Sequence, residues 1–298
     1  GVAPEKLRQG VPEPEDFDAF WQEEIRKLAA VPLKVLEKKT VESDNAVDVF
    51  DVKLSCAGDR PVSGYLTVPK AAKEGQKFPL RLRFDGYSVQ SAPLYRDSGY
   101  ITFSVNPHGI ENGREAAYYR ELQHSVLAGY GFRNAENQSP LTTYFHGMIL
   151  RGLRAAEFVK TLPEWDGKKL EIIGGSQGAF QSVAVAGLTG GVTGCSIQIP
   201  WFCDLGGIKV GRVRGWRPDP APGLLYYDTV NFAGRVRCPV RIDAGLSDWV
   251  CPPSGVRVLY NNLRCDKELI FRQGLDHAVY FGYDRNATPR VIAKEAGK

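Results

Sequence analysis

The sequence predicts an α/β fold with a mostly parallel central sheet flanked by helices on both faces. From residue 78 onward, short apolar segments alternate with longer helical or irregular stretches, which is typical of such sheets. The hydrophobic fraction of 43% and the charged fraction of 24% are those of an ordinary globular protein. No clear linker divides the chain. We therefore expect one domain over residues 1–298, with an N-terminal helical extension over about 14–30.

The N-terminal part is expected to form a helix followed by an antiparallel hairpin. Between Phe17 and Leu28, apolar residues recur at helical spacing and acidic residues stand near the start, so this stripe is expected to dock on the core. Residues 47–54 alternate as a strand and residues 62–68 form a second one, with turn residues between them. We expect this hairpin to lie at one edge of the sheet.

Six further strands account for the parallel part of the predicted sheet. Each is a short apolar segment followed by a helical or irregular stretch. They are Leu80–Phe84, Tyr100–Val105, Leu170–Ile173, Gly194–Ile199, Val240–Asp243 and Lys267–Phe271. The stretch from Gly206 to Gly223 is rich in Gly, Pro and Arg, and we expect an irregular excursion over the end of the sheet there.

A G-x-S-x-G pattern at residues 174–178 is the strongest chemical signal in the chain. It follows an apolar strand and precedes a helix-compatible run, which is the setting of the nucleophile elbow in α/β-hydrolases. The glycines on either side of the serine permit a tight strand-to-helix turn. The same letters also occur by chance in ordinary turns. Their placement here predicts an α/β-hydrolase fold with Ser176 as the nucleophile.

A serine nucleophile needs a base, and the base needs an acid that orients it. In α/β-hydrolases the acid and then the histidine follow the nucleophile, and His277 is the only histidine after Ser176. Asp243 lies inside a predicted strand and Asp276 adjoins the histidine, whereas Asp248 follows a strand by a short loop. We predict His277 as base and Asp248 as acid. The alternatives are a surface-loop histidine and a turn-capping aspartate.

Two backbone N–H groups are expected to form an oxyanion hole. Gln177 follows the nucleophile, and Tyr87 follows a predicted strand, although a plain turn is the alternative there. His108, Trp201 and Phe202 also follow predicted strands, and we predict that they contact the substrate. A structural histidine and core aromatic rings are the alternatives at these three positions.

Composition excludes several classes of partner. The net charge of +4 is small and the basic residues are scattered, which argues against nucleic acid. No apolar run approaches the roughly 20 residues that cross a bilayer, so we expect no membrane partner. Six cysteines lack metal-type spacing, and no metal is predicted.

The chain begins at Gly1 and its only methionine is Met148, so we expect that the native start is missing and slightly favour a periplasmic or secreted location.

Taken together, these residues resemble carbohydrate esterase family 7, the acetyl xylan esterases and cephalosporin C deacetylases. The resemblance runs from DFDAFW through RFDGY and GGSQG to YYDTVNFAGRVRCPV, AGLSDWVCPPS and the histidine loop, and it covers nearly the whole chain. It implies Ser176, His277 and Asp248 as the triad, with Tyr87 and Gln177 as the oxyanion donors. The implied reaction removes acetyl groups from sugar hydroxyls, such as those of xylan oligosaccharides, without a metal or an organic cofactor.

Three stretches depart from the pattern of that family. Residues 107–110 stand where the family carries R-G-Q-G, Ala278 stands where a glutamate is common, and residues 204–226 are short and rich in Gly and Pro. The departures concern substrate preference and the implied homo-oligomer, while the triad is unaffected. Two other functions remain open on the residues alone: a peptidase or thioesterase on the same fold, and a non-catalytic carbohydrate-binding relative.

Overall fold

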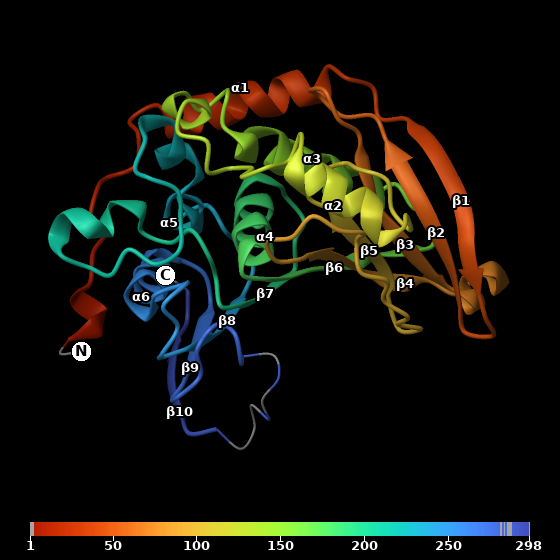
Figure 1. Ribbon diagram of the computed structural model, residues 1–298. Helices are drawn as coiled ribbons and strands as arrows, with labels where there is room; N and C mark the ends of the chain where they lie inside the picture. The colour runs from red at the N-terminus through yellow and green to blue at the C-terminus, as the bar shows by residue number, and fades with distance from the viewer. Residues whose placement is uncertain (1–2, 281, 283, 285–287, 298) are drawn as a thin grey trace.

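In the computed structural model, which describes residues 3–280, 282, 284 and 288–297, ten strands form one sheet (Figure 1). In chain order they are β1 (Val35–Ser43), β2 (Val47–Leu54), β3 (Val62–Pro69), β4 (Phe78–Phe84), β5 (Ile101–Asn106), β6 (Trp165–Gly175), β7 (Gly194–Gln198), β8 (Val240–Gly245), β9 (Lys267–Arg272) and β10 (Arg290–Glu295). Their order across the sheet is β1-β2-β3-β5-β4-β6-β7-β8-β9-β10. All pairs from β5 to β9 are parallel and the outer pairs are antiparallel. The predicted mostly parallel α/β sheet is confirmed.

The helices alternate with the strands along the chain. They are α1 (Phe17–Ala29), α2 (Ala116–His124), α3 (Tyr144–Val159), α4 (Gln177–Leu188), α5 (Thr229–Ala233) and α6 (Pro253–Asn262). Short 3-10 helices lie at Pro4–Lys6, Lys70–Glu74, Glu136–Gln138, Leu205–Val210 and Pro222–Tyr227. None of these described helices is both long and apolar enough to cross a bilayer.

One face of the sheet carries a continuous helical layer. Helix α3 packs on β3, β5 and β4, helix α4 packs on β4, β6 and β7, and α1 lies across α3 (Figure 1). The buried positions of β4 and β6 alternate, so Phe84, Ile172 and Gly174 face these helices. Helices α5 and α6 extend the layer toward β8. Because α4 lies at the centre of this helical layer, its first residues lie near the middle of the sheet.

The opposite face of β4 is covered by aromatic side chains rather than by a helix. The guanidinium of Arg81 lies 3.5 Å from the ring centre of Tyr100, and that of Arg83 lies 3.7 Å from the ring centre of Tyr95. Both tyrosines come from the irregular segment between β4 and β5. The expectation of helices on both faces is therefore not met at β4, since this crossover contains no helix and its rings stack on the arginines.

The N-terminal hairpin is present, but it is not the edge of the sheet. Strand β1 pairs with β2 along its length and lies outside it, and β10 forms the other edge beside β9. Neither strand is predicted from the sequence, because LEKKTV and RVIAKE are mostly exposed and lack apolar alternation. Charged residues are usual on edge strands, where they discourage further pairing.

The N-terminal helix docks through the stripe that the sequence indicates. In α1, Phe17, Trp21 and Leu28 are buried in the main hydrophobic core. The indole Nε1 of Trp21 donates to the carbonyl of Tyr226 at 3.2 Å, and this bond ties the helix to the segment before α5. Aromatic side chains supply most of this contact area because each buries a large apolar surface.

Candidate active site

The turn between β6 and α4 holds Ser176 in a strained backbone conformation, with φ 53° and ψ −119°. A non-glycine residue in such a conformation costs about 1–3 kcal/mol. The neighbouring glycines are required by close approach: a Cβ on Gly178 would lie 2.1 Å from the carbonyl oxygen of Phe84, and one on Gly174 would lie 2.3 Å from that of Gly178. The Ser176 N–H donates to the Gln198 carbonyl at 2.9 Å. The turn therefore has the geometry of a nucleophile elbow.

The structure brings Ser176, His277 and Asp248 together, although they come from three different loops. The Oγ of Ser176 lies 3.2 Å from Nε2 of His277, and Nδ1 of the same ring lies 2.9 Å from Oδ2 of Asp248. These loops follow β6, β8 and β9, which are parallel, so all three side chains project from the same end of the sheet.

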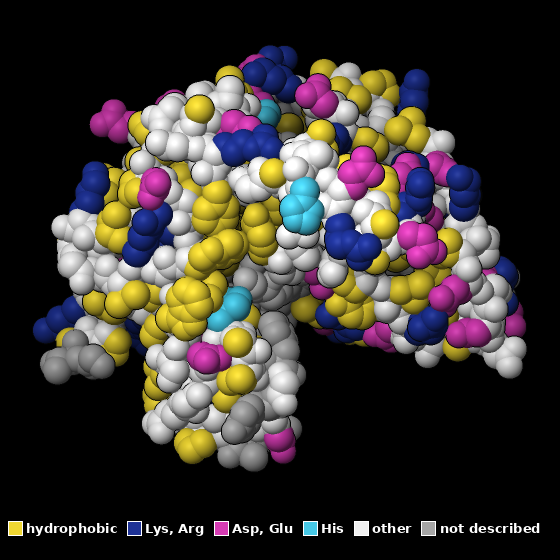
Figure 2. Space-filling view, in the orientation of Figure 1, with side chains coloured by type: hydrophobic (Ala, Val, Ile, Leu, Met, Phe, Trp, Pro, Cys, Tyr) yellow, Lys and Arg dark blue, Asp and Glu magenta, His cyan; other side chains and the backbone are white. Residues whose placement is uncertain are grey.

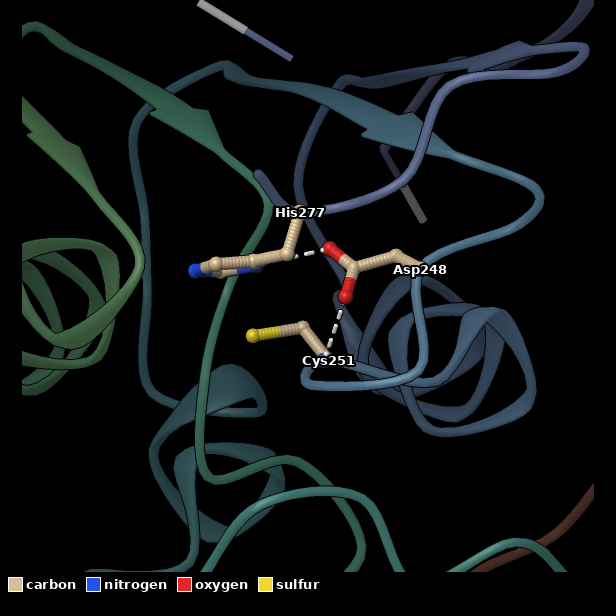
Figure 3. Close-up of side chains that lie close together, drawn as sticks. All are labelled: Asp248, Cys251 and His277. Atoms are coloured by element: carbon tan, nitrogen blue, oxygen red, sulfur yellow. Dashed lines mark hydrogen bonds and ion pairs between the residues drawn. The ribbon is translucent and has the colours of Figure 1, made fainter. Parts of the chain in front are cut away.

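The carboxylate of Asp248 is fixed by its own turn. Its Oδ1 accepts hydrogen bonds from the backbone N–H groups of Val250 at 2.9 Å and Cys251 at 2.8 Å, while Oδ2 faces the histidine (Figure 3). The side chain is fully buried, whereas that of His277 is 22% exposed. Asp248 therefore caps its turn and also contacts the imidazole. The triad acid and the turn-capping aspartate, which were alternatives on the sequence alone, are the same residue.

The neighbouring Asp243 is engaged elsewhere. Its carboxylate accepts hydrogen bonds from the guanidinium of Arg272, at 2.7 Å from Nε to Oδ1 and 2.5 Å from Nη2 to Oδ2, and it also accepts from the Tyr280 hydroxyl. Tyr280 lies just beyond the loop that carries His277 and is completely buried. This buried ionic cluster anchors the histidine loop to the sheet.

The two predicted oxyanion donors, Gln177 and Tyr87, lie beside the nucleophile. Gln177 is the first residue of α4, and Gly86, which precedes Tyr87, approaches the Cβ of Ser176 so closely that its own Cβ would lie 3.7 Å away. In the described part of the chain, the N–H of neither Gln177 nor Tyr87 donates to another protein group. Both donors are thus left for an acceptor outside the chain, such as an ester oxygen.

Tyr130 contacts both predicted oxyanion donors, Tyr87 and Gln177. Its ring stacks on that of Tyr87 with centroids 4.2 Å apart and planes 12° apart. Its hydroxyl donates to the side-chain Oε1 of Gln177 at 3.0 Å, and both partners of this bond are buried. Burial raises the pKa of Tyr130 well above its usual value, so the hydroxyl keeps its proton and remains a donor. We therefore predict a positioning role for Tyr130, which no sequence motif indicates.

Replacing Tyr130 by phenylalanine keeps the stack and removes the hydrogen bond to Gln177. We expect kcat for an acetyl ester to fall about fivefold with KM nearly unchanged, because one buried hydrogen bond is worth about 1 kcal/mol and acts here on the transition state. Tyr119→Phe is the matched control, since the Tyr119 hydroxyl donates to the Glu111 carbonyl at 3.1 Å in another part of the molecule. An equal loss in both variants, or a loss confined to KM, would contradict the positioning role.

His108 lies in the interior instead of at the site's rim. Its side chain has no exposed area, Nδ1 lies 2.7 Å from the Tyr144 hydroxyl, and Nε2 lies 2.7 Å from the Ser88 carbonyl. Burial lowers its pKa to about 3, so the ring is neutral at ordinary pH. The prediction that His108 contacts substrate is wrong, because both ring nitrogens are engaged within the core. Its ring packs edge-on against Tyr130, behind the oxyanion residues.

Trp201 and Phe202 are also core residues. Only 1% and 2% of their surfaces are exposed, and their rings stack on each other with centroids 4.4 Å apart. The indole Nε1 of Trp201 donates to the Trp216 carbonyl at 2.6 Å. The cavity that these rings line with Cys251 has a volume of about 10 Å³, which is too small for a sugar. The predicted substrate contact through these two rings is therefore wrong, and the core interpretation holds.

Partly exposed aromatic rings lie instead around Tyr87. Trp216 packs edge-on against Tyr87 with centroids 4.8 Å apart, and Phe132 lies 4.6 Å from Trp216. We call Tyr87, Phe132 and Trp216 the aromatic cluster. Figure 2 shows hydrophobic side chains in a band that ends beside a histidine. No sequence pattern indicates Phe132 or Trp216, because both lie in irregular segments without periodicity.

A nucleophile elbow at the centre of a mostly parallel sheet, followed in the chain by an acid and a histidine, defines the α/β-hydrolase class. The sequence pattern of the acetyl xylan esterase (AXE1) family matches residues 5–210 and 222–293. The chain belongs to the acetyl xylan esterase family. The resemblance seen in the sequence is thereby confirmed.

Individual relatives agree with this family. Acetyl esterase Axe7A of Xylanibacter ruminicola is 29% identical over 294 residues, which cover 93% of this chain and 66% of that protein. The chain thus spans about two thirds of the length of this relative. Crystal structures of acetyl xylan esterases from Thermoanaerobacterium sp. and Paenibacillus sp. R4 share the fold. Each has a TM-score of 0.76 over 92% of this chain, with 22% and 21% identity and coverage of 92% and 93% of the respective structure.

Proposed function

We propose that this chain hydrolyses acetyl esters of sugar hydroxyls, such as those of xylan oligosaccharides, through an acetyl-enzyme formed on Ser176. The observation that carries the proposal is the continuous contact from the Ser176 hydroxyl through His277 to the buried carboxylate of Asp248. Membership of the acetyl xylan esterase family supports the substrate class.

The proposed reaction has two steps. His277 Nε2 takes the proton of Ser176 Oγ as that oxygen attacks the ester carbonyl, and the oxyanion accepts hydrogen bonds from the N–H groups of Gln177 and Tyr87. The imidazolium, stabilised by Asp248, then protonates the leaving sugar oxygen, and the acetyl-enzyme remains. In the second step a water molecule gives its proton to His277 and attacks the acetyl group. Acetate leaves and the serine recovers its proton.

The aromatic cluster supports a sugar substrate. Its three rings are partly exposed, and one of them belongs to Tyr87, a predicted oxyanion donor. A pyranose whose acetyl group lies at the oxyanion site would therefore extend over the apolar surface of these rings. Trp249, directly after Asp248, is 62% exposed and adds a further ring to this end of the sheet.

A substrate comparison tests the proposal. We expect acetate release from acetylated xylo-oligosaccharides, while an acetyl thioester and peptide anilides react at least about 100-fold more slowly in kcat/KM, because those leaving groups would not use the aromatic cluster. Ser176→Ala supplies the background for each substrate. Faster turnover of the thioester or the peptides would contradict the substrate class. Binding of xylo-oligosaccharides without turnover of any ester would favour a non-catalytic role.

A further inference from the structure

Three donor side chains of different chemical types meet at the triad. Asp248, Cys251 and His277 each place one potential ligand atom within 4.8 Å of the other two (Figure 3). Carboxylate oxygen, thiolate sulfur and imidazole nitrogen are the donors that zinc takes in proteins, and three such ligands leave the fourth tetrahedral position open. The proposed hydrolysis uses the carboxylate and the imidazole, whereas the Cys251 thiol has no part in it.

We propose that Asp248, Cys251 and His277 form an inhibitory binding site for a thiophilic divalent cation, such as Zn²⁺ or Cd²⁺. As the metal–sulfur bond forms, the thiol of Cys251 releases its proton to solvent. Neutral His277 then has one ring nitrogen bound to the cation and its single proton on the other, so neither nitrogen can take the proton of Ser176, and ester hydrolysis stops until the cation dissociates. This site goes beyond the proposed esterase function, because it binds a ligand that is neither substrate nor product.

The geometry of the turn preassembles this site. The backbone N–H of Cys251 donates to Oδ1 of Asp248 at 2.8 Å, so the thiol and the carboxylate are held on the same tight turn. Donor atoms around a tetrahedral zinc ion lie about 3.3–3.7 Å apart. All three donor atoms lie within 4.8 Å of one another, so their widest separation needs to close by only about 1 Å. The partly exposed ring of His277 gives the cation a path from solvent.

The chemistry of Cys251 makes the site selective for soft cations. Cys251 is 3% exposed and supplies the single sulfur ligand of the site, which favours metals with high affinity for thiolate. Mg²⁺ and Ca²⁺ prefer oxygen ligands and gain little from a thiolate. We therefore expect inhibition by Zn²⁺ and Cd²⁺ but not by Mg²⁺ at the same concentration.

Two readouts on the full chain test the site. The first is the concentration of ZnCl₂ that halves the rate of each variant relative to its own metal-free rate, with recovery after EDTA. The second is the ultraviolet thiolate-to-cadmium charge-transfer absorption on titration with CdCl₂, which needs no turnover and so does not depend on the proposed function. The variants are Cys251→Ala and the nearly isosteric Cys251→Ser, with Cys56→Ser as control because Cys56 is the half-buried cysteine among the six.

The expected result is a rise of about tenfold or more in the inhibitory Zn²⁺ concentration for both Cys251 variants, since even changes outside the ligand shell weaken metal binding by 10–100-fold. The cadmium absorption should be lost in the same two variants and retained in Cys56→Ser. Unchanged cadmium absorption in the Cys251 variants, or zinc inhibition equal to that of the wild type, would overturn the proposal. Loss of the signal in Cys56→Ser alone would overturn it as well.

Discussion

Replacing Ser176 by alanine should abolish ester hydrolysis. With p-nitrophenyl acetate we expect kcat to fall about 10⁴- to 10⁶-fold, because the remaining oxyanion hole and binding surface give only a small part of the rate enhancement. The change removes one oxygen atom whose described partner is His277, so the fold should persist. The rate of the variant, with folding checked by circular dichroism, measures the contribution of the nucleophile.

Ser196→Ala is the matched control for that experiment. Ser196 lies on β7, beside β6, and is exposed, so its removal should leave kcat within about twofold of the wild type. A Ser176→Ala enzyme that retains even a tenth of the wild-type rate would show that another group performs the attack.

Replacing Asp248 by asparagine should give the second largest loss. An asparagine amide directed at Nδ1 of His277 would favour the wrong tautomer and place a donor where the imidazole needs an acceptor. We expect kcat to fall about 10³- to 10⁴-fold with little change in KM, because the substrate does not touch this side chain. Steady-state kinetics on the purified variant give both constants.

Asp276→Asn is the control for the acid. Asp276 adjoins His277, and its Oδ1 accepts a hydrogen bond from the Val279 N–H at 3.0 Å, so its role is to shape the loop. We expect kcat to change less than about fivefold, in line with the loss of one exposed hydrogen bond. If this substitution costs as much as Asp248→Asn, the assignment of the acid is contradicted.

The sequence predicted the elements that carry strong local patterns. The inner strands from β2 to β9 follow apolar periodicity, and the elbow at Ser176 carries its own glycine signature. Chain order then predicts His277, and a position just beyond a predicted strand predicts Asp248. The edge strands β1 and β10 escaped prediction because both of their faces are mostly exposed, so no apolar alternation marks them.

The residues that support the predicted site residues could not be predicted from the sequence. Tyr130 and Trp216 come from irregular segments, and only the folded chain brings them to Tyr87. Cys251 lies three residues after Asp248, but a lone cysteine in a turn carries no local signal of a ligand role. For His108, strand-end position suggested the rim, whereas its actual place depends on how Ser88 and Tyr144 close over the ring.

Covalent labelling with p-nitrophenyl diethyl phosphate directly tests whether Ser176 is the nucleophile of an esterase site. This reagent phosphorylates an activated serine and leaves a stable adduct that peptide mass spectrometry can locate. We expect one adduct per chain, on the peptide that contains Ser176, formed in proportion to the loss of activity and absent from Ser176→Ala. An adduct on another residue, or full activity after complete labelling of Ser176, would contradict it.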